Sequence, residues 1–167
     1  MHTLYLVSVW LHIVAVAAWL GGMLFLVLVV VPWMRKGDRA TGARILRETG
    51  ARFRTVGWSV FVIVLVTGSF NLYVRGVRLG SFVDPVFLLS PFGRAVVLKL
   101  ALFVAVVGLS AVHDFVVGPR ATEALVRAPG SAEAESLRRA ASVMGRVSTV
   151  LALALVAVGV VLVRGCG

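Results

Sequence analysis

Four long apolar runs constrain how this chain can fold. They cover about residues 4–33, 55–73, 95–117 and 147–163, and each is near or above the roughly 20 residues that a helix needs to cross a bilayer. The runs show no period-two alternation, and a sheet with open edges cannot satisfy its backbone groups in lipid. We therefore expect an all-α integral membrane protein, a single domain built as an up-down bundle of four transmembrane helices.

Composition supports a membrane protein over a soluble one. Hydrophobic residues make up 60% of the chain and charged residues 14%, whereas soluble domains average about 45–50% apolar and about 25% charged residues. The single cysteine, Cys166, excludes an internal disulfide and a CxxC motif. The net charge of +10 is better explained by basic membrane loops than by binding to nucleic acid, which we do not expect as a partner.

The distribution of basic residues predicts the orientation of the chain. Most of them lie in the connections 34–54 and 118–146, and basic loops stay on the cytoplasmic side. We expect a multi-pass protein of a bacterial-type inner (plasma) membrane with both termini on the outer, periplasmic side. The basic segment 40–53 is typical of a helix that lies on anionic lipid at the cytoplasmic face. A homodimer or a redox partner is left open.

Capping residues predict several helix boundaries. The Ser90–Pro91 pair is a typical helix start, with proline at the first helical position. The Gly118–Pro119 pair predicts the end of that helix, and Thr3 is a candidate cap for the first helix. Ser131, followed by two glutamates, predicts a fourth helix that begins well before its apolar span and enters the membrane without a break.

Four ionisable residues within the spans are the candidates for function: His12, Lys99, His113 and Asp114. A charge at the bilayer centre costs about 2.5–3.5 kcal/mol on insertion scales, so such residues usually face the bundle interior and have partners. The helical rise places His12 and Lys99 at similar depth in the outer half and His113 roughly 20 Å deeper than Lys99.

These positions predict two polar clusters. The first, here called the terminal cluster, lies in the half of the bundle that holds both chain ends and contains His12, Asn71, Tyr73, Arg75 and Lys99. The second, the distal cluster, lies in the other half and contains Ser59, His113, Asp114, Arg120 and Arg146. A structural salt bridge between Asp114 and Arg120 is the simpler explanation for that carboxylate.

Histidine within a helical bundle favours haem b as a cofactor, because imidazole is a good axial ligand of haem iron. Apolar walls, with Trp19 as one contact, and the cations Arg75, Arg78 and Arg94 for the propionates would complete the site. Copper is the alternative, since imidazole and thioether ligands both suit it. For His12 and Trp19, a hydrogen-bonding or packing role is the simpler alternative.

One haem cannot be clamped by His12 and His113 together. Two axial histidines need α-carbons roughly 12–13 Å apart across the metal, and the predicted difference in depth exceeds this. Either His12 binds a metal with another ligand or with an open position, or the metal-ligand candidates His12 and His113 serve separate sites. Lys99 is open to three functional roles, as a sixth ligand, a propionate partner or a proton carrier, or it extends towards the membrane surface.

Two motifs carry a resemblance to a known family. The run from Trp10 through His12 to Phe25, and the Gly93–Lys99 stretch with its G-R-x-x-x-x-K pattern, resemble the copper-resistance D family, as do the Thr67–Gly68 pair and Asn71. The chain is similar, more loosely, to the J-type membrane protoporphyrinogen oxidases. That second resemblance implies haem b at His12 and an essential lysine at Lys99, and the first implies a role in copper uptake or tolerance.

The sequence therefore leaves three hypotheses about function. The first is a membrane protein that binds haem b through His12 for electron transfer or haem-linked redox chemistry, in which case any enzymatic activity is that of a haem-dependent oxidoreductase. The second is a copper transport or resistance protein without haem. The third is a non-catalytic membrane subunit that docks a partner through its basic face.

Overall fold

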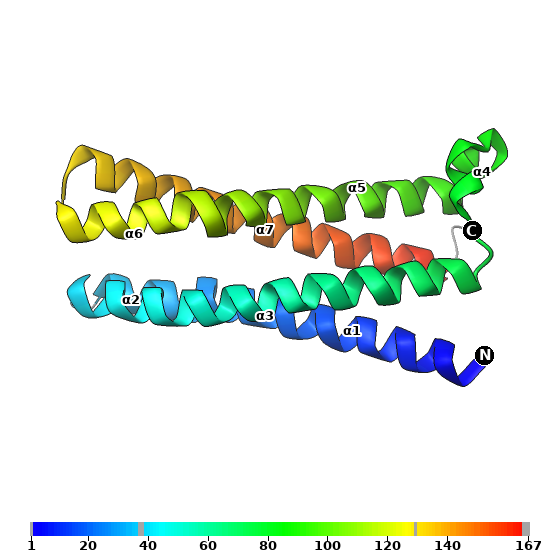
Figure 1. Ribbon diagram of the computed structural model, residues 1–167, viewed down its shortest axis with the longest axis horizontal. Coiled ribbons are helices and arrows are strands. Elements are labelled where there is room, and N and C mark those ends of the chain that lie inside the picture. Colours follow the sequence, from blue (N-terminus) through cyan, green and yellow to red (C-terminus); the bar gives the residue numbers. More distant parts are fainter. Residues whose placement is uncertain (1, 37–38, 129, 165–167) are drawn as a thin grey trace.

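The computed structural model describes residues 2–36, 39–128 and 130–164, with side chains described for residues 2–33, 48–128 and 130–164. All secondary structure in these ranges is helical (Figure 1). The elements are, in order, α1 (His2–Phe25), the π-helical turn η1 (Leu26–Val30), α2 (Val31–Lys36), α3 (Arg39–Val74), the 3-10 turn η2 (Leu79–Val83), α4 (Pro85–Leu89), α5 (Pro91–Val112), the π-helical turn η3 (His113–Val117), α6 (Gly118–Arg127) and α7 (Ala132–Arg164).

Four helices in the described residues are long and apolar enough to cross a membrane. They are His2–Trp33, Glu48–Val74, Pro91–Arg127 and Ala132–Arg164. Large apolar side chains such as Leu65, Val104 and Val150 face outward on these helices, as expected where the solvent of the bundle is lipid. The protein is therefore a multi-pass membrane protein, as the apolar runs predict.

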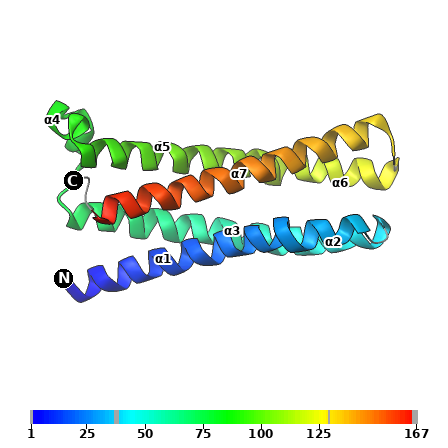
Figure 2. The ribbon, with the colours of Figure 1, turned by 180° about the vertical axis from the view of Figure 1, so that it is seen from behind.

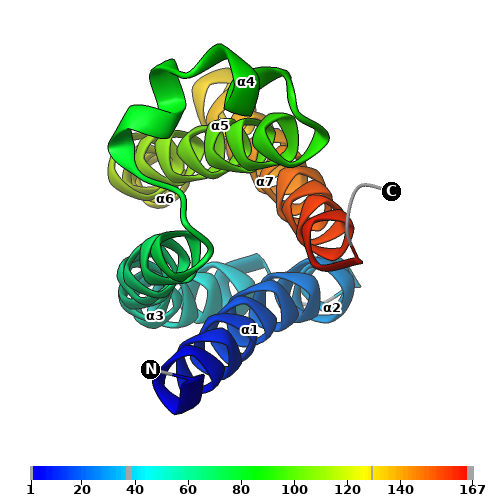
Figure 3. The ribbon, with the colours of Figure 1, turned by 90° about the vertical axis from the view of Figure 1, so that its right-hand side faces the viewer.

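The helices form two hairpins that meet along the bundle axis. Helix α1 packs mainly on α3, and α5 with η3 and α6 packs mainly on α7, whereas α1 with α7 and α3 with α6 touch less extensively. The start of α1 and the end of α7 lie at the same end of the bundle in both side views (Figures 1 and 2). The view along the bundle shows α7 next to α1, with α5 and α6 on the opposite side from α1 and α3 (Figure 3).

Two of the predicted capping sites are confirmed. Ser90 Oγ accepts a hydrogen bond from the backbone N–H of Gly93 at 3.0 Å, and Pro91 is the first residue of α5. Ser131 Oγ accepts a bond from the N–H of Ala134 at 3.2 Å, and α7 then runs unbroken to its end. Thr3 is not a cap, because α1 already includes His2 and Thr3.

The prediction that the Gly118–Pro119 pair ends a helix is wrong. The helix continues through η3 into α6 and reaches Arg127. In η3 the N–H of Gly118 bonds the carbonyl of His113, five residues back. Since proline clashes with the carbonyl four residues before it in an ordinary helix, the wider π turn gives Pro119 room without stopping the helix. The basic segment 40–53 is helical, as predicted, and forms the first part of α3.

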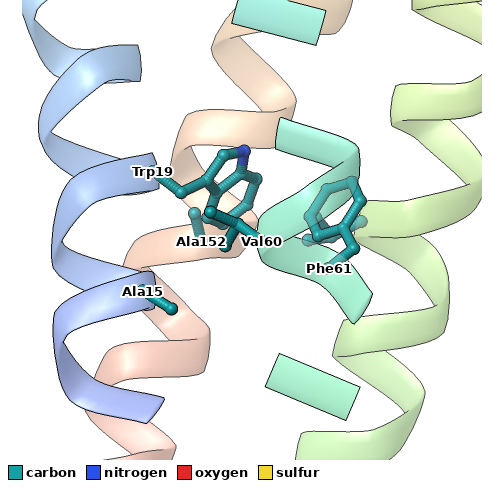
Figure 4. Packing of buried hydrophobic residues seen from close by; sticks show 6 residues of the cluster. Ala15, Trp19, Val60, Phe61 and Ala152 are labelled. Carbon is teal, nitrogen blue, oxygen red and sulfur yellow. The ribbon is translucent and has the colours of Figure 1, made fainter. Parts of the chain in front are cut away.

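The apolar core lies in the middle of the bundle. It consists of Ala15, Trp19, Val60, Phe61, Val106 and Ala152, contributed by all four long helices (Figure 4). The indole of Trp19 meets the ring of Phe61 edge-on, with centroids 5.1 Å apart, and Phe61 in turn meets Phe103 at 6.1 Å. Small residues let the helices approach each other, and the aromatic rings fill the space between them.

Candidate functional site: two polar clusters on the bundle axis

The imidazole of His12 is held by Thr67 in the terminal half of the bundle. His12 Nδ1 lies 2.8 Å from Thr67 Oγ1, and Thr67 Oγ1 donates its single proton to the carbonyl of Ile63 at 2.6 Å. The hydroxyl can therefore only accept from His12, so Nδ1 carries the proton. This tautomer leaves Nε2 of His12 with a free lone pair, which is the state that binds a metal or accepts a proton.

The neighbourhood of His12 is fixed by two small contacts between α1 and α3. Ser8 Oγ donates to the carbonyl of Thr67 at 3.4 Å, one helical turn before His12. A Cβ at Gly68 would lie 3.3 Å from His12 Cε1, so glycine there leaves room for the ring. In the Thr67–Gly68 pair, Thr67 thus hydrogen-bonds the ring of His12 and Gly68 leaves space for that ring.

Lys99 enters the same half of the bundle from α5 and reaches α7. A Cβ at Gly159 would lie 3.3 Å from Lys99 Nζ, so the absence of a side chain at Gly159 admits the ammonium group. The charge of Lys99 acts on His12, and that of Arg75 acts on Lys99. Within the described part of the chain, Lys99 makes no ion pair.

Arg75 completes the terminal cluster from the end of α3. Its Nε donates to Tyr5 Oη at 3.3 Å, and a guanidinium N–H donates to the carbonyl of Leu162 at 3.2 Å. Arg75 thereby links α3 to α1 and α7. Asn71, one turn before Arg75, has a side-chain oxygen that is buried without a hydrogen-bond partner among the described residues.

Two residues predicted for this site lie in the same half of the bundle but outside the cluster. Tyr73 is exposed, because the helix turns it away from the face that carries Asn71. The guanidinium of Arg78 lies over one face of its ring, 3.9 Å from the ring centroid. Arg94 is exposed in the first turn of α5. The structure therefore brings together His12, Lys99 and Arg75, with Asn71 beside Arg75, and leaves Tyr73 and Arg94 outside the terminal cluster.

The distal cluster is organised by Asp114 in η3. Its Oδ2 accepts from the indole Nε1 of Trp58 at 3.2 Å, and its Oδ1 accepts from His113 Nδ1 at 2.9 Å. Because a carboxylate only accepts, His113 Nδ1 carries the proton and Nε2 is left free. A carboxylate that orients a histidine in this way is the usual partner of a metal-binding imidazole.

Arg54 is the second charged group of the distal cluster. It donates to the backbone carbonyl of Asp114 at 2.9 Å, and its guanidinium lies 5.7 Å from the ring centroid of Phe115. Arg54, Trp58 and Phe61 follow one another at i, i+4 and i+7 on α3, the spacing of one helical face. This spacing on α3 is the sequence signal from which Arg54 and Trp58 could have been predicted as members of the distal cluster.

The other predicted members of the distal cluster do not join it. Ser59 is exposed and bonds the carbonyl of Thr55, and Arg146 bonds Ser142 on its own helix. The predicted pair between Asp114 and Arg120 is replaced by the bonds of Asp114 to His113 and Trp58, because η3 turns the carboxylate towards α3. Arg120 instead lines a cavity of about 440 Å³ at the α6–α7 turn.

A small cavity of about 150 Å³ lies beside the distal cluster, between all four helices. It is here called the distal cavity, and its polar or sulfur-bearing lining residues are Met23, Arg54, Ser110, His113, Asp114 and Ser148. Trp19 and Phe61 also line it, so the aromatic core separates it from the terminal cluster. Its volume is below the roughly 300 Å³ at which pockets for drug-sized ligands begin, and it suits an ion or a few water molecules.

Comparison with known proteins gives the family. A family model described as copper resistance protein D matches residues 47–163, which is more than half of the chain. The chain belongs to the copper resistance protein D family. It is 30% identical over 151 residues to an uncharacterized protein of Aquifex aeolicus (strain VF5), covering 90% of this chain and 89% of that protein.

A second relative of this family member is the copper resistance protein D of Pseudomonas syringae pv. tomato. The two are 27% identical over 129 residues, covering 77% of this chain and 39% of that protein. This chain thus spans well under half the length of that relative. No solved structure matches the chain.

Family membership confirms the resemblance to the copper-resistance D family and agrees with the second hypothesis, a copper-resistance membrane protein. Haem binding, the leading hypothesis from the sequence, gains no support from these relatives. No group of three or more histidine, cysteine, aspartate or glutamate side chains that could hold a metal ion occurs among the described residues.

Proposed function

We propose that this protein binds and handles copper within the membrane. The observation that carries the proposal is the family match over residues 47–163, and the relative named copper resistance protein D supports it. The bundle offers two imidazoles with free Nε2 atoms, His12 and His113, and the neutral imidazole is a common copper ligand. The chemistry around each ring decides which of them is the better site.

The distal cavity is the better site for the ion. His113 and Met23 both line it, and imidazole with thioether is a ligand set that favours Cu(I). Asp114 orients His113 and supplies a negative charge beside it. Arg54 also lines the cavity and donates to the backbone carbonyl of Asp114. The formal charges of Arg54 and Asp114 sum to zero, so the lining has no net negative charge to stabilise a divalent ion, and a soft monovalent ion is favoured.

His12 is less suited to a bare cation. The positive charge of Lys99 acts on its ring, and that of Arg75 acts on Lys99. A metal cation at Nε2 would be repelled by the half-buried ammonium group of Lys99, and the low dielectric of the bundle interior screens that repulsion weakly. We therefore assign copper to His113 and Met23.

The test is Cu(I) binding by the purified full-length protein, measured anaerobically by competition with a chromophoric Cu(I) chelator. We expect His113→Gln and Met23→Leu each to weaken Cu(I) binding at least tenfold. Asp114→Asn should weaken it by about 10–100-fold, as loss of an orienting partner usually does. Unchanged affinity in both His113→Gln and Met23→Leu would contradict the assigned site.

Matched controls are available in the chain. His2→Gln removes an exposed histidine at the start of α1, and Met144→Leu removes a methionine that does not line the distal cavity. Neither should change Cu(I) affinity. If His12→Gln abolishes Cu(I) binding while His113→Gln does not, copper handling stands and the ligand assignment is wrong.

Two further measurements address the function as a whole. Deleting the gene should change copper tolerance of the host, and complementation with His113→Gln should fail to restore it. An absorption spectrum after haem-replete expression tests the alternative. A Soret band that disappears in His12→Ala, together with no Cu(I) binding, would replace copper by haem b as the ligand of this protein.

A further inference from the structure

The connection between the second and third spans exposes a group of large apolar side chains. It contains the 3-10 turn η2 and the short helix α4. Three of its side chains are the most exposed large apolar side chains in the part of the chain that the structure describes. With a fourth they form what is here called the apolar edge, which consists of Leu79, Val83, Val86 and Leu89, with exposed fractions of 91%, 80%, 79% and 67%. Clustered exposed apolar side chains usually mark a contact surface.

Aromatic rings on the other side of this segment hold it against the start of α5. The ring of Phe87 meets the rings of Phe82 and Phe92 edge-on, with centroids 5.9 and 6.2 Å away. The carbonyl of Phe87 also packs closely on Gly93, where a Cβ would lie 1.8 Å from its oxygen. The apolar edge is therefore held in a fixed position, which lowers the entropy cost of any contact that it makes.

The position of the apolar edge relative to the spans indicates what covers it. Helix α4 ends at Leu89, and the third span begins with α5 at Pro91. The view along the bundle shows α4 on the outer side of α5, away from α1 and α3 (Figure 3). Further along α5, Leu98 and Val104 are exposed where the helix faces lipid. The apolar edge thus lies next to the lipid-facing surface, at the level where the span begins.

The chemistry of the apolar edge favours lipid over a protein partner. Its members are leucine and valine only, whereas the residues that dominate protein interfaces are enriched in tryptophan, tyrosine and arginine. Arg94 is exposed in the first turn of α5, and a guanidinium group at this level suits a lipid phosphate. The nearby carboxylate of Asp84 is engaged within the segment, because its Oδ1 accepts the N–H of Val86 at 3.0 Å.

We propose that η2 and α4 form an interfacial anchor, which inserts the apolar edge into the lipid leaflet at the terminal half of the bundle. The ligand is a phospholipid surface, with acyl chains around the apolar edge and phosphates near Arg94. Interfacial helices bury their apolar face about 5–10 Å into the boundary between headgroups and acyl chains. The anchor requires only the spans and the apolar edge, so the copper experiments and the lipid experiment can fail independently of each other.

The test is the accessibility of a nitroxide label on the full-length protein in liposomes of phosphatidylcholine and phosphatidylglycerol. Cys166 is the single cysteine, so Cys166→Ser provides a background in which one introduced thiol carries the label. Val83→Cys and Val86→Cys each place the label on the apolar edge. Oxygen, which concentrates in lipid, should relax both labels more than the water-soluble nickel complex NiEDDA does. The ratio of the two effects should correspond to a depth of about 5–10 Å below the phosphates.

Two labelled positions serve as controls in the same background. Val104→Cys lies in the exposed middle of α5 and should report a greater depth in lipid. Ala132→Cys lies at the exposed start of α7 and should be relaxed more by NiEDDA than by oxygen. Labels at 83 and 86 that behave like Ala132→Cys would overturn the proposal by placing the apolar edge in water. Labels shielded from both reagents would also overturn it, because protein would then cover the apolar edge.

Discussion

The indole nitrogen of Trp58 lies 3.2 Å from Asp114 Oδ2 and joins the two hairpins of the bundle through a hydrogen bond. Trp58 belongs to α3, and Asp114 belongs to the π-helical turn between α5 and α6. The rings of Trp58 and Phe115 add a contact at 5.4 Å between centroids. Together with the bond from Arg54 to the backbone carbonyl of Asp114, this pair holds α3 against η3 in the distal half.

Trp58→Phe should destabilise the bundle by removing this bond while keeping an aromatic ring. Hydrogen bonds between membrane helices contribute about 0.6 kcal/mol on average and up to about 1.7 kcal/mol, and the carboxylate acceptor places this one towards the upper value. Unfolding in SDS would measure the change. Trp10→Phe, at an exposed tryptophan on α1, is the control, and equal stability of the two variants would argue against the role of Trp58.

Adjacent glycines on α1 should respond differently to alanine. A Cβ at Gly22 would lie 2.4 Å from Phe53 Cε2, whereas a Cβ at Gly21 would meet nothing within 4 Å. Gly22→Ala should therefore destabilise the protein by about 1–3 kcal/mol through overpacking. Gly21→Ala should be neutral or slightly stabilising, because alanine favours helix. The comparison is made by SDS unfolding, and Phe53→Leu should partly rescue Gly22→Ala.

Gly93→Ala should disturb the turn between α4 and α5. A Cβ at Gly93 would lie 1.8 Å from the backbone oxygen of Phe87, and backbone cannot move aside as a side chain can. We expect loss of folded protein, measured as monodisperse yield in detergent. Gly108→Ala, in the exposed middle of α5 with no atom within 4 Å of the new Cβ, should express like the wild type. A normal yield for Gly93→Ala would show that α4 can shift.

Thr67→Val should release the ring of His12 without changing the volume at position 67. The bond to Nδ1 is lost, so the proton is free to move to Nε2, and ¹⁵N NMR of His12 should change from one tautomer to a mixture. Thr149→Val is the control, since Thr149 bonds only the carbonyl of Gly145 in its own helix. A His12 spectrum that is the same in wild type and Thr67→Val would mean that Thr67 does not set the tautomer.

The positions of the polar groups along the helices followed from the sequence, but most of their partners did not. Helical rise alone placed His12 and Lys99 in one half of the bundle and His113 in the other, and the structure keeps them apart. How each helix is rotated about its axis decides which residue becomes a hydrogen-bond partner. It makes Thr67 the partner of His12, and Trp58 rather than Arg120 the partner of Asp114. Rotation is set by packing between residues more than fifty positions apart, which no local pattern records.

The sequence by itself determined that four helices cross a membrane and where α5 and α7 begin, because apolar length and capping at Ser90 and Ser131 are local properties of the chain. Only the tertiary structure decided that the third span continues through Pro119, since the π turn at His113–Val117 shifts the hydrogen bonding by one residue. It also decided the electrical character of the two sites. Among the described residues, Arg54 comes to donate to the backbone carbonyl of Asp114, whereas Lys99 and Arg75 form no ion pair with a carboxylate. Groups that are far apart along the chain meet only when the hairpins pack.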